Sequence, residues 1–143
     1  MREMVFCTTC RFSVAEPCAP DGRTGGETLA LHVEAVLSEA GRGDIRVARQ
    51  VCLWNCKRHC SVVLRDSERF TYFTGDHLPE RAQAEAIVAW FDMHGKTETG
   101  EVLRQPDPVI GRPALALRSR AVQQEGTAIT ARRWKPQGIA PRI

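Results

Sequence analysis

The sequence lacks any long apolar run, and this absence argues against two classes of protein. No stretch approaches the roughly 18–20 consecutive apolar residues that a helix needs to cross a bilayer. The first residues, Met1 to Cys7, also lack the apolar segment of a secretory signal peptide. We therefore expect a protein without a membrane partner that works in the cytoplasm, where thiols stay reduced.

The motifs of common enzyme classes are missing as well. The sequence contains no glycine-rich phosphate loop, no pattern of a hydrolytic triad and no paired carboxylates. These absences favour an electron carrier or a metal-binding protein over an enzyme. A chain of 143 residues, of which 43% are hydrophobic, can bury an ordinary core and should form about one domain.

Acidic residues are almost absent from the C-terminal part of the chain. From Arg112 onward there are seven Arg or Lys residues and one acidic residue, Glu125, which gives a local charge of +6. The preceding part has 13 basic and 16 acidic residues, a charge of −3. A mildly acidic body with a basic tail is not typical of a nucleic-acid-binding domain. The tail is either a solvated segment or a contact for an acidic partner.

Hydrophobic periodicity predicts four strands and two helices. The strands are expected at 4–6, 45–51, 61–65 and 69–73, and the helices at 29–40 and 79–94. The last two strands should form a hairpin around a three-residue turn. The apolar face of the second helix is expected to consist of Ala82, Ala86, Ile87, Trp90 and Phe91.

The order β-α-β, cysteine loop, β-β-α predicts an α/β protein with a thioredoxin-like fold. The β-α-β unit should be parallel and right-handed, and the hairpin should add two antiparallel strands to the same sheet. We therefore expect a mixed four-stranded sheet covered by helices in residues 1–95. Residues 96–143 are expected to form an extended arm and a basic tail, with a short strand or helix near 115–122.

Six cysteines form two groups, each placed just after a predicted strand. They are Cys7, Cys10 and Cys18 in the first group and Cys52, Cys56 and Cys60 in the second. The C-terminal ends of the two parallel strands should meet at one edge of the sheet, so we expect the groups to converge. Thiolates that lie so close together repel one another unless a cation neutralises them. A metal or redox site is the resulting prediction.

The cysteine spacing distinguishes between metals. Zinc sites usually combine two Cys-x2-Cys pairs, and only Cys7 and Cys10 have that spacing here. The tight x2-x2 run of a 4Fe–4S site is absent. Two cysteines from each loop, Cys7-x10-Cys18 and Cys52-x3-Cys56, fit a 2Fe–2S cluster in which each iron takes two thiolates.

These segments resemble the thioredoxin-like 2Fe–2S ferredoxins. The pattern of those proteins is a strand and a Cys, ten to twelve residues, a Cys and a Gly-containing loop, a helix, a strand, Cys-x3-Cys, and an aromatic hairpin. The matching segments are Val5-Phe6-Cys7, Cys18 to Gly22, Val51 to Cys56, and Phe70 to Tyr72. The resemblance implies a 2Fe–2S cofactor on Cys7, Cys18, Cys52 and Cys56, one-electron transfer with a redox partner protein, and a homodimer.

Residues 4–113 also resemble a family of small bacterial proteins described as predicted metal-binding, often encoded near cobalamin or metal-homeostasis genes. The matching segments are Cys7-Thr-Thr-Cys10, Cys52-Leu-Trp-Asn-Cys56-Lys-Arg-His-Cys60 and Phe70 to Asp76. This pattern supplies Cys10 and Cys60 where the ferredoxin pattern uses Cys18. We expect Cys7, Cys52 and Cys56 as ligands, with Cys18 ahead of Cys10 for the fourth position and Cys60 as an alternate. A metal-binding or delivery protein for zinc, cobalt or copper is the alternative function.

Several alternatives stay open at individual residues. Cys7 and Cys10 follow a strand and could form the dithiol of a thiol–disulfide oxidoreductase, although no proline precedes the third strand. Cys60 could be a small buried hydrophobe, and His59 could replace a cysteine on one iron. Trp54, between two candidate ligands, could shield the cluster, dock a partner or pack in the core.

Overall fold

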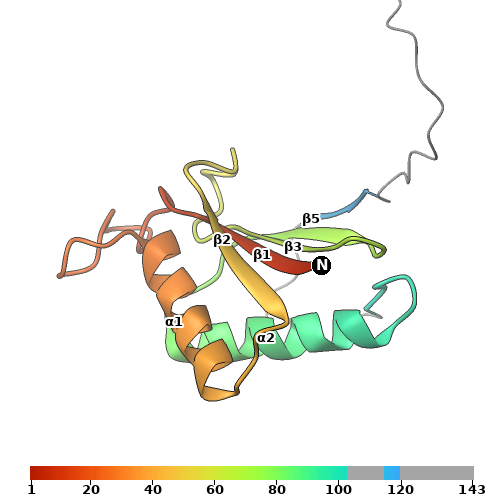
Figure 1. The fold of residues 1–143 in the computed structure, drawn as a ribbon. Helices are drawn as coiled ribbons and strands as arrows, with labels where there is room; N and C mark the ends of the chain where they lie inside the picture. The colour runs from red at the N-terminus through yellow and green to blue at the C-terminus, as the bar shows by residue number, and fades with distance from the viewer. Residues whose placement is uncertain (103–114, 120–143) are drawn as a thin grey trace, which may run out of the picture.

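The computed structural model describes residues 1–102 and 115–119. Five strands and two helices follow one another along this part of the chain (Figure 1). They are β1 (Arg2–Cys7), α1 (Gly25–Glu39), β2 (Ile45–Gln50), β3 (Val62–Asp66), β4 (Thr71–Thr74), α2 (Arg81–Lys96) and β5 (Leu115–Ser119).

The strands form one mixed sheet in the order β2-β1-β3-β4-β5. β1 and β2 are parallel, whereas β3 is antiparallel to β1, and β4 is antiparallel to β3. The first four strands and the two helices confirm the predicted α/β, thioredoxin-like arrangement. β5 adds a fifth strand, antiparallel to β4, from within the predicted arm. The rest of that arm and the basic tail, residues 103–114 and 120–143, lie outside the described residues.

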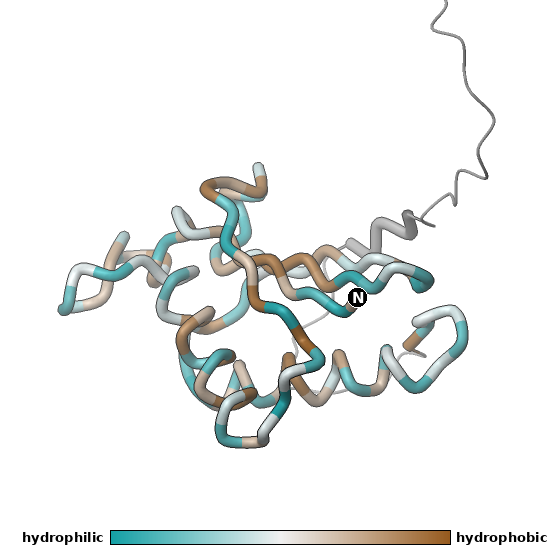
Figure 2. The backbone as a smooth tube through the Cα atoms, in the orientation of Figure 1, coloured by the Kyte–Doolittle hydropathy of each residue, from teal (hydrophilic) through white to brown (hydrophobic). Residues whose placement is uncertain are grey.

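Both helices lie against the same face of the sheet (Figure 1). Because side chains alternate between the two faces of a strand, Met4 and Phe6 of β1 point into this layer and are fully buried. They share one core with Leu29 of α1 and with Ile87 and Phe91 of α2. Figure 2 shows apolar stretches in the central strands and alternating apolar and polar positions along both helices.

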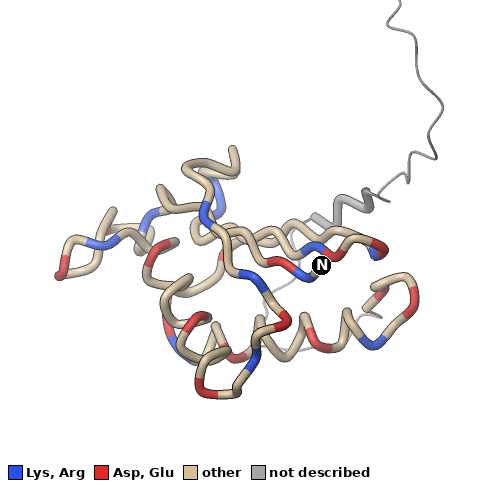
Figure 3. Tube along the Cα trace, in the orientation of Figure 1, with Lys and Arg blue, Asp and Glu red and all other residues tan. Residues whose placement is uncertain are grey.

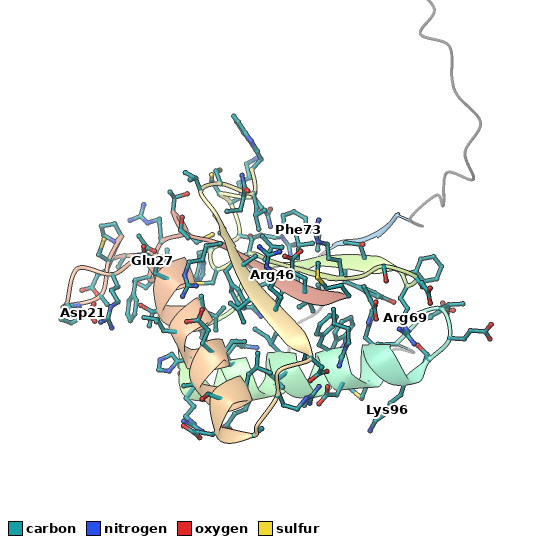
Figure 4. All side chains as sticks on the ribbon, viewed as in Figure 1. Asp21, Glu27, Arg46, Arg69, Phe73 and Lys96 are labelled. Atoms are coloured by element: carbon teal, nitrogen blue, oxygen red, sulfur yellow. The ribbon has the colours of Figure 1, made fainter. Side chains whose placement is uncertain are left out.

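The opposite face of the sheet has no helix over it among the described residues (Figure 1). Glu3 projects there and is nevertheless buried, because arginines on both neighbouring strands cover it. Arg65 donates a hydrogen bond of 2.5 Å to the Glu3 carboxylate, and Arg46 lies 3.4 Å from it. The three residues occupy one row across β2, β1 and β3. The cross-strand ion pairs therefore cover part of a face on which the described residues place no helix. Arg46 is labelled on this face in Figure 4.

Helix α1 starts at Gly25 because Thr24 caps it. The Thr24 hydroxyl accepts a hydrogen bond from the Glu27 N–H, and the Glu27 carboxylate accepts one from the Thr24 N–H, both at 3.3 Å. The first turn then meets the chain that leaves β1. A Cβ atom on Gly26 would lie 1.7 Å from the carbonyl oxygen of Cys7. Glycine is therefore required for this close approach.

Helix α2 differs in detail from the sequence prediction. It begins at Arg81, two residues later than predicted, after an extended Glu80 that makes no side-chain cap. The prediction that Ala82 belongs to the apolar face is wrong. Ala82 lies exposed in the first turn, and Ala84 and Val88 are buried instead. Among the described residues, no helix is long and apolar enough to span a bilayer.

Substitution of Gly26 by Ala should destabilise the protein. A Cβ atom there collides with backbone rather than with a flexible side chain, so α1 must move. We expect a loss of about 1–3 kcal/mol or more in the free energy of unfolding, measured by urea unfolding followed by circular dichroism. Gly43→Ala is the matched control because a Cβ there meets no atom within 4 Å. Equal losses in the two variants would contradict the role of the close approach.

Candidate functional site

The ends of β1 and β2 lie side by side, as the sequence predicts. Cys7 is opposite Gln50 in the parallel register. The Thr8 N–H donates to the Gln50 carbonyl at 2.9 Å, and the Thr9 hydroxyl donates to the Val51 carbonyl at 2.7 Å. The Cys7 Sγ itself lies 3.8 Å from the Val51 carbonyl oxygen. These contacts bring the first cysteine group against the segment in which the second group begins.

Three thiols of this edge are buried. Cys7 is 4% exposed, Cys10 is 7% exposed and Cys60 is fully buried. The Cys10 Sγ accepts a hydrogen bond of 3.4 Å from the Ser61 N–H, and the Cys60 Sγ donates to the Arg11 carbonyl at 3.6 Å. The Ser61 carbonyl also accepts a bond of 3.2 Å from the Cys7 N–H. The start of β3 thus holds both ends of the Cys-x2-Cys segment.

The remaining thiols of the second group lie nearer to solvent. Cys52 is half-buried and Cys56 is exposed, and their side chains contact each other. The Cys52 Sγ accepts a hydrogen bond of 3.3 Å from the Trp54 N–H. The Asn55 amide donates to the Ser61 hydroxyl at 2.9 Å and ties this loop to the buried thiols. A row of thiols therefore runs from the surface into the core.

Cys18 lies apart from these five cysteines. It is half-buried in the loop between β1 and α1, which projects from the body in Figure 1. Its backbone forms an isolated bridge with Thr24. Within residues 1–102, no hydrogen bond connects its thiol to another thiol. The choice of Cys18 over Cys10 as the fourth ligand stays a prediction from spacing, whereas contact with Cys7 favours Cys10.

Burial and hydrogen bonding give the inner thiols different acidities. Burial raises the pKa of Cys60 to about 12, and the nearby Cys10 and Cys7 add to the effect. Burial also raises the pKa of Cys10 to about 11. For Cys7, burial again acts to raise the pKa, but hydrogen bonds from Cys10 and from the backbone of Leu53 outweigh it, so the pKa falls below its ordinary value. Cys7 is therefore the inner thiol whose ionised form the structure favours.

The N-terminus of α1 lies against the cysteine loop. The Gly25 N–H donates to the Cys10 carbonyl at 3.0 Å, so the first turn of the helix lies against the Cys-x2-Cys loop. A Cβ atom on Gly25 would lie 2.8 Å from the Cys60 Sγ. The Gly26 N–H donates to the same carbonyl at 3.4 Å, so the start of the helix holds the backbone of this loop in place.

Among the described residues, three other than glycine have a positive φ angle, and all three lie at this edge. The angles are 57° at Trp54, 52° at Cys60 and 61° at Asp76. Such conformations are unfavourable for residues with a Cβ and persist where the surroundings enforce them. Asp76 donates its N–H to the His59 carbonyl at 2.9 Å and pairs with Arg58 at 3.0 Å. The segment after β4 therefore clamps the cysteine loop in place.

The donor atoms suit a soft metal, since thiolates are the preferred ligands of iron–sulfur clusters, zinc and Cu(I). Their arrangement is not that of a finished metal site. In the part of the chain that the structure describes, no three His, Cys, Asp or Glu side chains form a group that could hold a metal ion. The segment between β2 and β3, which contains neither helix nor strand, would have to adjust to complete one.

Two polar residues of the site escaped the sequence analysis. Ser61 contacts Cys10 through its backbone, and the Thr9 hydroxyl lies 3.7 Å from the Cys7 Sγ. The only signal for either was its place beside a cysteine in the sequence. The contact between Ser61 and Cys10 depends on the pairing of β3 with β1, which spacing does not reveal.

Comparison with known proteins assigns a family but no activity. A family model described as "Protein of unknown function (DUF1636)" matches residues 4–119, and the chain belongs to this family. No curated protein and no solved structure matches the chain.

The six thiols should react with iodoacetamide in an order set by access and acidity. In the reduced, metal-free chain at pH 8, we expect Cys56 to be alkylated first because it is exposed. Cys10 and Cys60 should react last, because both are buried and their pKa values are raised to about 11 and about 12. Peptide mass spectrometry of timed samples measures the order. Early labelling of Cys60 in the folded protein would contradict the described burial.

His77 should make the stability depend on pH. It is buried, and its Nε2 lies 2.8 Å from the Thr74 hydroxyl. Burial lowers the pKa of His77 from 6.5 to about 4, so the unfolded chain binds a proton more readily than the folded one. Stability from this group is complete above pH 6.5 and is lost as the pH falls through 6.5 towards 4, by up to about 3 kcal/mol.

Urea unfolding between pH 4 and 7 tests this dependence. His77→Asn should reduce the decline in the free energy of unfolding across that interval relative to the unsubstituted protein. His32→Asn, on α1, is the matched control for the loss of one histidine. An unchanged decline in His77→Asn would show that other groups cause it.

Proposed function

We propose that this member of the DUF1636 family binds a 2Fe–2S cluster on cysteine thiolates and works in the cytoplasm as a one-electron carrier for a redox partner protein. The observation that supports it most is the gathering of five of the six cysteines at one edge of a thioredoxin-like sheet. The resemblance to thioredoxin-like 2Fe–2S ferredoxins points in the same direction. It also implies a homodimer, which sedimentation equilibrium of the full chain would test.

Three ligands are common to both sequence patterns, namely Cys7, Cys52 and Cys56. The fourth is Cys18 if spacing decides and Cys10 if contact in the folded chain decides. Cys60 is the alternate, because it is fully buried and Cys10 lies close enough to affect its pKa. The proposal therefore draws two ligands from each loop, and together they supply the four thiolates that a 2Fe–2S cluster takes.

The bound cluster would supply the one-electron chemistry. The residues around it would set its charge and its access to water. Backbone N–H groups of Leu53 and Ser61 face the sulfur atoms and favour negative charge there. Burial of Cys7 excludes water on the inner side, while the exposed Cys56 leaves the outer side open to a partner.

The contact between Cys7 and Cys10 favours a second candidate, a thiol–disulfide oxidoreductase. Cys7 has a lowered pKa and Cys10 a raised one, which is the division of roles between an attacking and a resolving thiol. Two observations weigh against it. Both thiols are buried, and α1 begins at Gly25 instead of at the dithiol, where a helix would lower the thiol pKa most strongly.

Anaerobic purification followed by visible spectroscopy and iron and sulfide analysis tests the cluster. We expect absorption bands at about 400–460 nm from thiolate-to-iron charge transfer, with two irons and two sulfides per chain. Cys52→Ser and Cys56→Ser should each abolish the bands, because both sequence patterns use these thiols. Comparison of Cys18→Ser with Cys10→Ser identifies the fourth ligand, since only loss of a true ligand removes the cluster.

Other outcomes of the same experiment assign the alternative functions. A colourless protein with one zinc, or a protein with one cobalt or copper, would replace the electron carrier by a metal-binding or delivery protein. A metal-free protein that reduces disulfides, and that needs only Cys7 and Cys10 to do so, would be an oxidoreductase.

A further inference from the structure

Two large apolar side chains stand in solvent on either side of Cys52. Trp54 is 93% exposed and Val51 is 69% exposed. This exposure excludes packing of Trp54 within the described fold. Burial of a Trp ring is among the largest single contributions to a core or an interface, so the exposed ring is suited to an interface. We call Val51 and Trp54 the apolar pair.

The backbone around Trp54 is fixed, although its ring is exposed. The residue has a φ angle of 57°, a conformation that a bulky side chain rarely adopts. Its N–H donates to the Cys52 Sγ at 3.3 Å, and the next residue, Asn55, is anchored to the Ser61 hydroxyl at 2.9 Å. The local structure therefore holds the ring outward next to a candidate ligand.

Positive charge lies near the apolar pair. The segment 51–60 contains Lys57 and Arg58 and no acidic residue, and Figure 3 shows blue basic positions along this part of the tube. The loop between β1 and α1 contributes the exposed Arg11, whose carbonyl accepts a hydrogen bond from the Cys60 thiol, and its acidic residues Glu16 and Asp21 come later in the loop. Arg58 is paired with Asp76, whereas Lys57 and Arg11 have no ion pair with the described residues. At the other end of the sheet the arginines are neutralised, as when Arg42 binds Asp44 and Asp92.

We propose that the apolar pair is the docking site for an acidic redox protein. Trp54 would enter an apolar notch of that protein, while Lys57 and Arg11 face its carboxylates. Exposed aromatic residues commonly dominate binding energy, and surrounding charges raise the association rate. This inference rests on the proposed electron transfer, because it places the partner directly over Cys52 and Cys56. A second copy of the chain is disfavoured as occupant, since a two-fold contact would bring Lys57 and Arg11 near their own copies.

Electron transfer from the reduced protein to two haem proteins tests the inference. Cytochrome b5 is the acidic probe and cytochrome c is the basic one, and stopped-flow absorbance gives both rates. With cytochrome b5 at low salt, Trp54→Ala and Lys57→Glu should each slow the reaction about tenfold, and salt should slow the unsubstituted protein. With cytochrome c, Lys57→Glu should speed the reaction.

Two matched variants serve as controls. Leu31→Ala removes an exposed apolar side chain from α1, and Lys96→Glu reverses a charge at the end of α2, away from the cysteines (Figure 4). Both should stay within about twofold of the unsubstituted rate with either probe. Visible absorption checks that each variant keeps its cluster.

The inference is overturned if Trp54→Ala behaves like Leu31→Ala, or if Lys57→Glu behaves like Lys96→Glu. A protein isolated without a cluster would refute the proposed function but not the docking site. In that case, an NMR titration of the full chain with cytochrome b5 tests the docking site. Chemical-shift changes in segment 51–58 that Trp54→Ala abolishes would support the docking site. Chemical-shift changes elsewhere, or no changes, would overturn it.

Discussion

Cys7 lies opposite Gln50 in a parallel pair of strands, and the C-terminal ends of a parallel pair meet at the same edge of a sheet. That constraint decides where the chemistry of this chain is located. It brings two cysteine groups together from segments that the whole of α1 and β2 separate in sequence. The antiparallel β3 then starts at the same edge, so that Cys60 and Ser61 complete the inner side of the site. Without the parallel register, the thiols would have no common position.

The two forces that act on the inner thiols oppose each other. Burial favours the neutral form of Cys10 and Cys60, whereas backbone N–H groups, such as that of Ser61 beside Cys10, favour the charged form. Cys7 is the thiol for which hydrogen bonding outweighs burial. The site therefore combines one sulfur with a lowered pKa and two that stay protonated near neutral pH. Any metal or cluster that binds all three must displace protons from the inner pair.

The fold could be predicted from the sequence because the spacing of apolar residues indicates which segments are strands and which are helices. The alternation of Met4 and Phe6, and the helical spacing of Leu29 and Val33, depend only on local order and on burial. Sequence reasoning also predicted that the ends of β1 and β2 meet. It did not predict the early start of α1 at Gly25, because the close approach of Gly26 to Cys7 exists only between segments distant in sequence. Glycine there looked like a loop residue.

The positions of the individual cysteines in the site could not be predicted from their spacing in the sequence. Spacing placed Cys18 ahead of Cys10 as the partner of Cys7, yet the fold turns Cys10 inward and holds Cys18 in a projecting loop. The difference arises from the pairing of β3 with β1, which supplies the N–H group that Cys10 contacts. The exposure of Trp54 was likewise undecided, because a tryptophan between two cysteines is compatible with packing, shielding or docking.

The burial of Cys60 has a further consequence for the life of the protein in the cell. Its side chain belongs to the same continuous core as Met4 and Phe6, with α1 against its sulfur. Oxidation or alkylation of this sulfur therefore requires the core to open first. Oxidation of Cys60 would place a larger polar group among apolar side chains, loosen that packing and leave the chain more open to proteases.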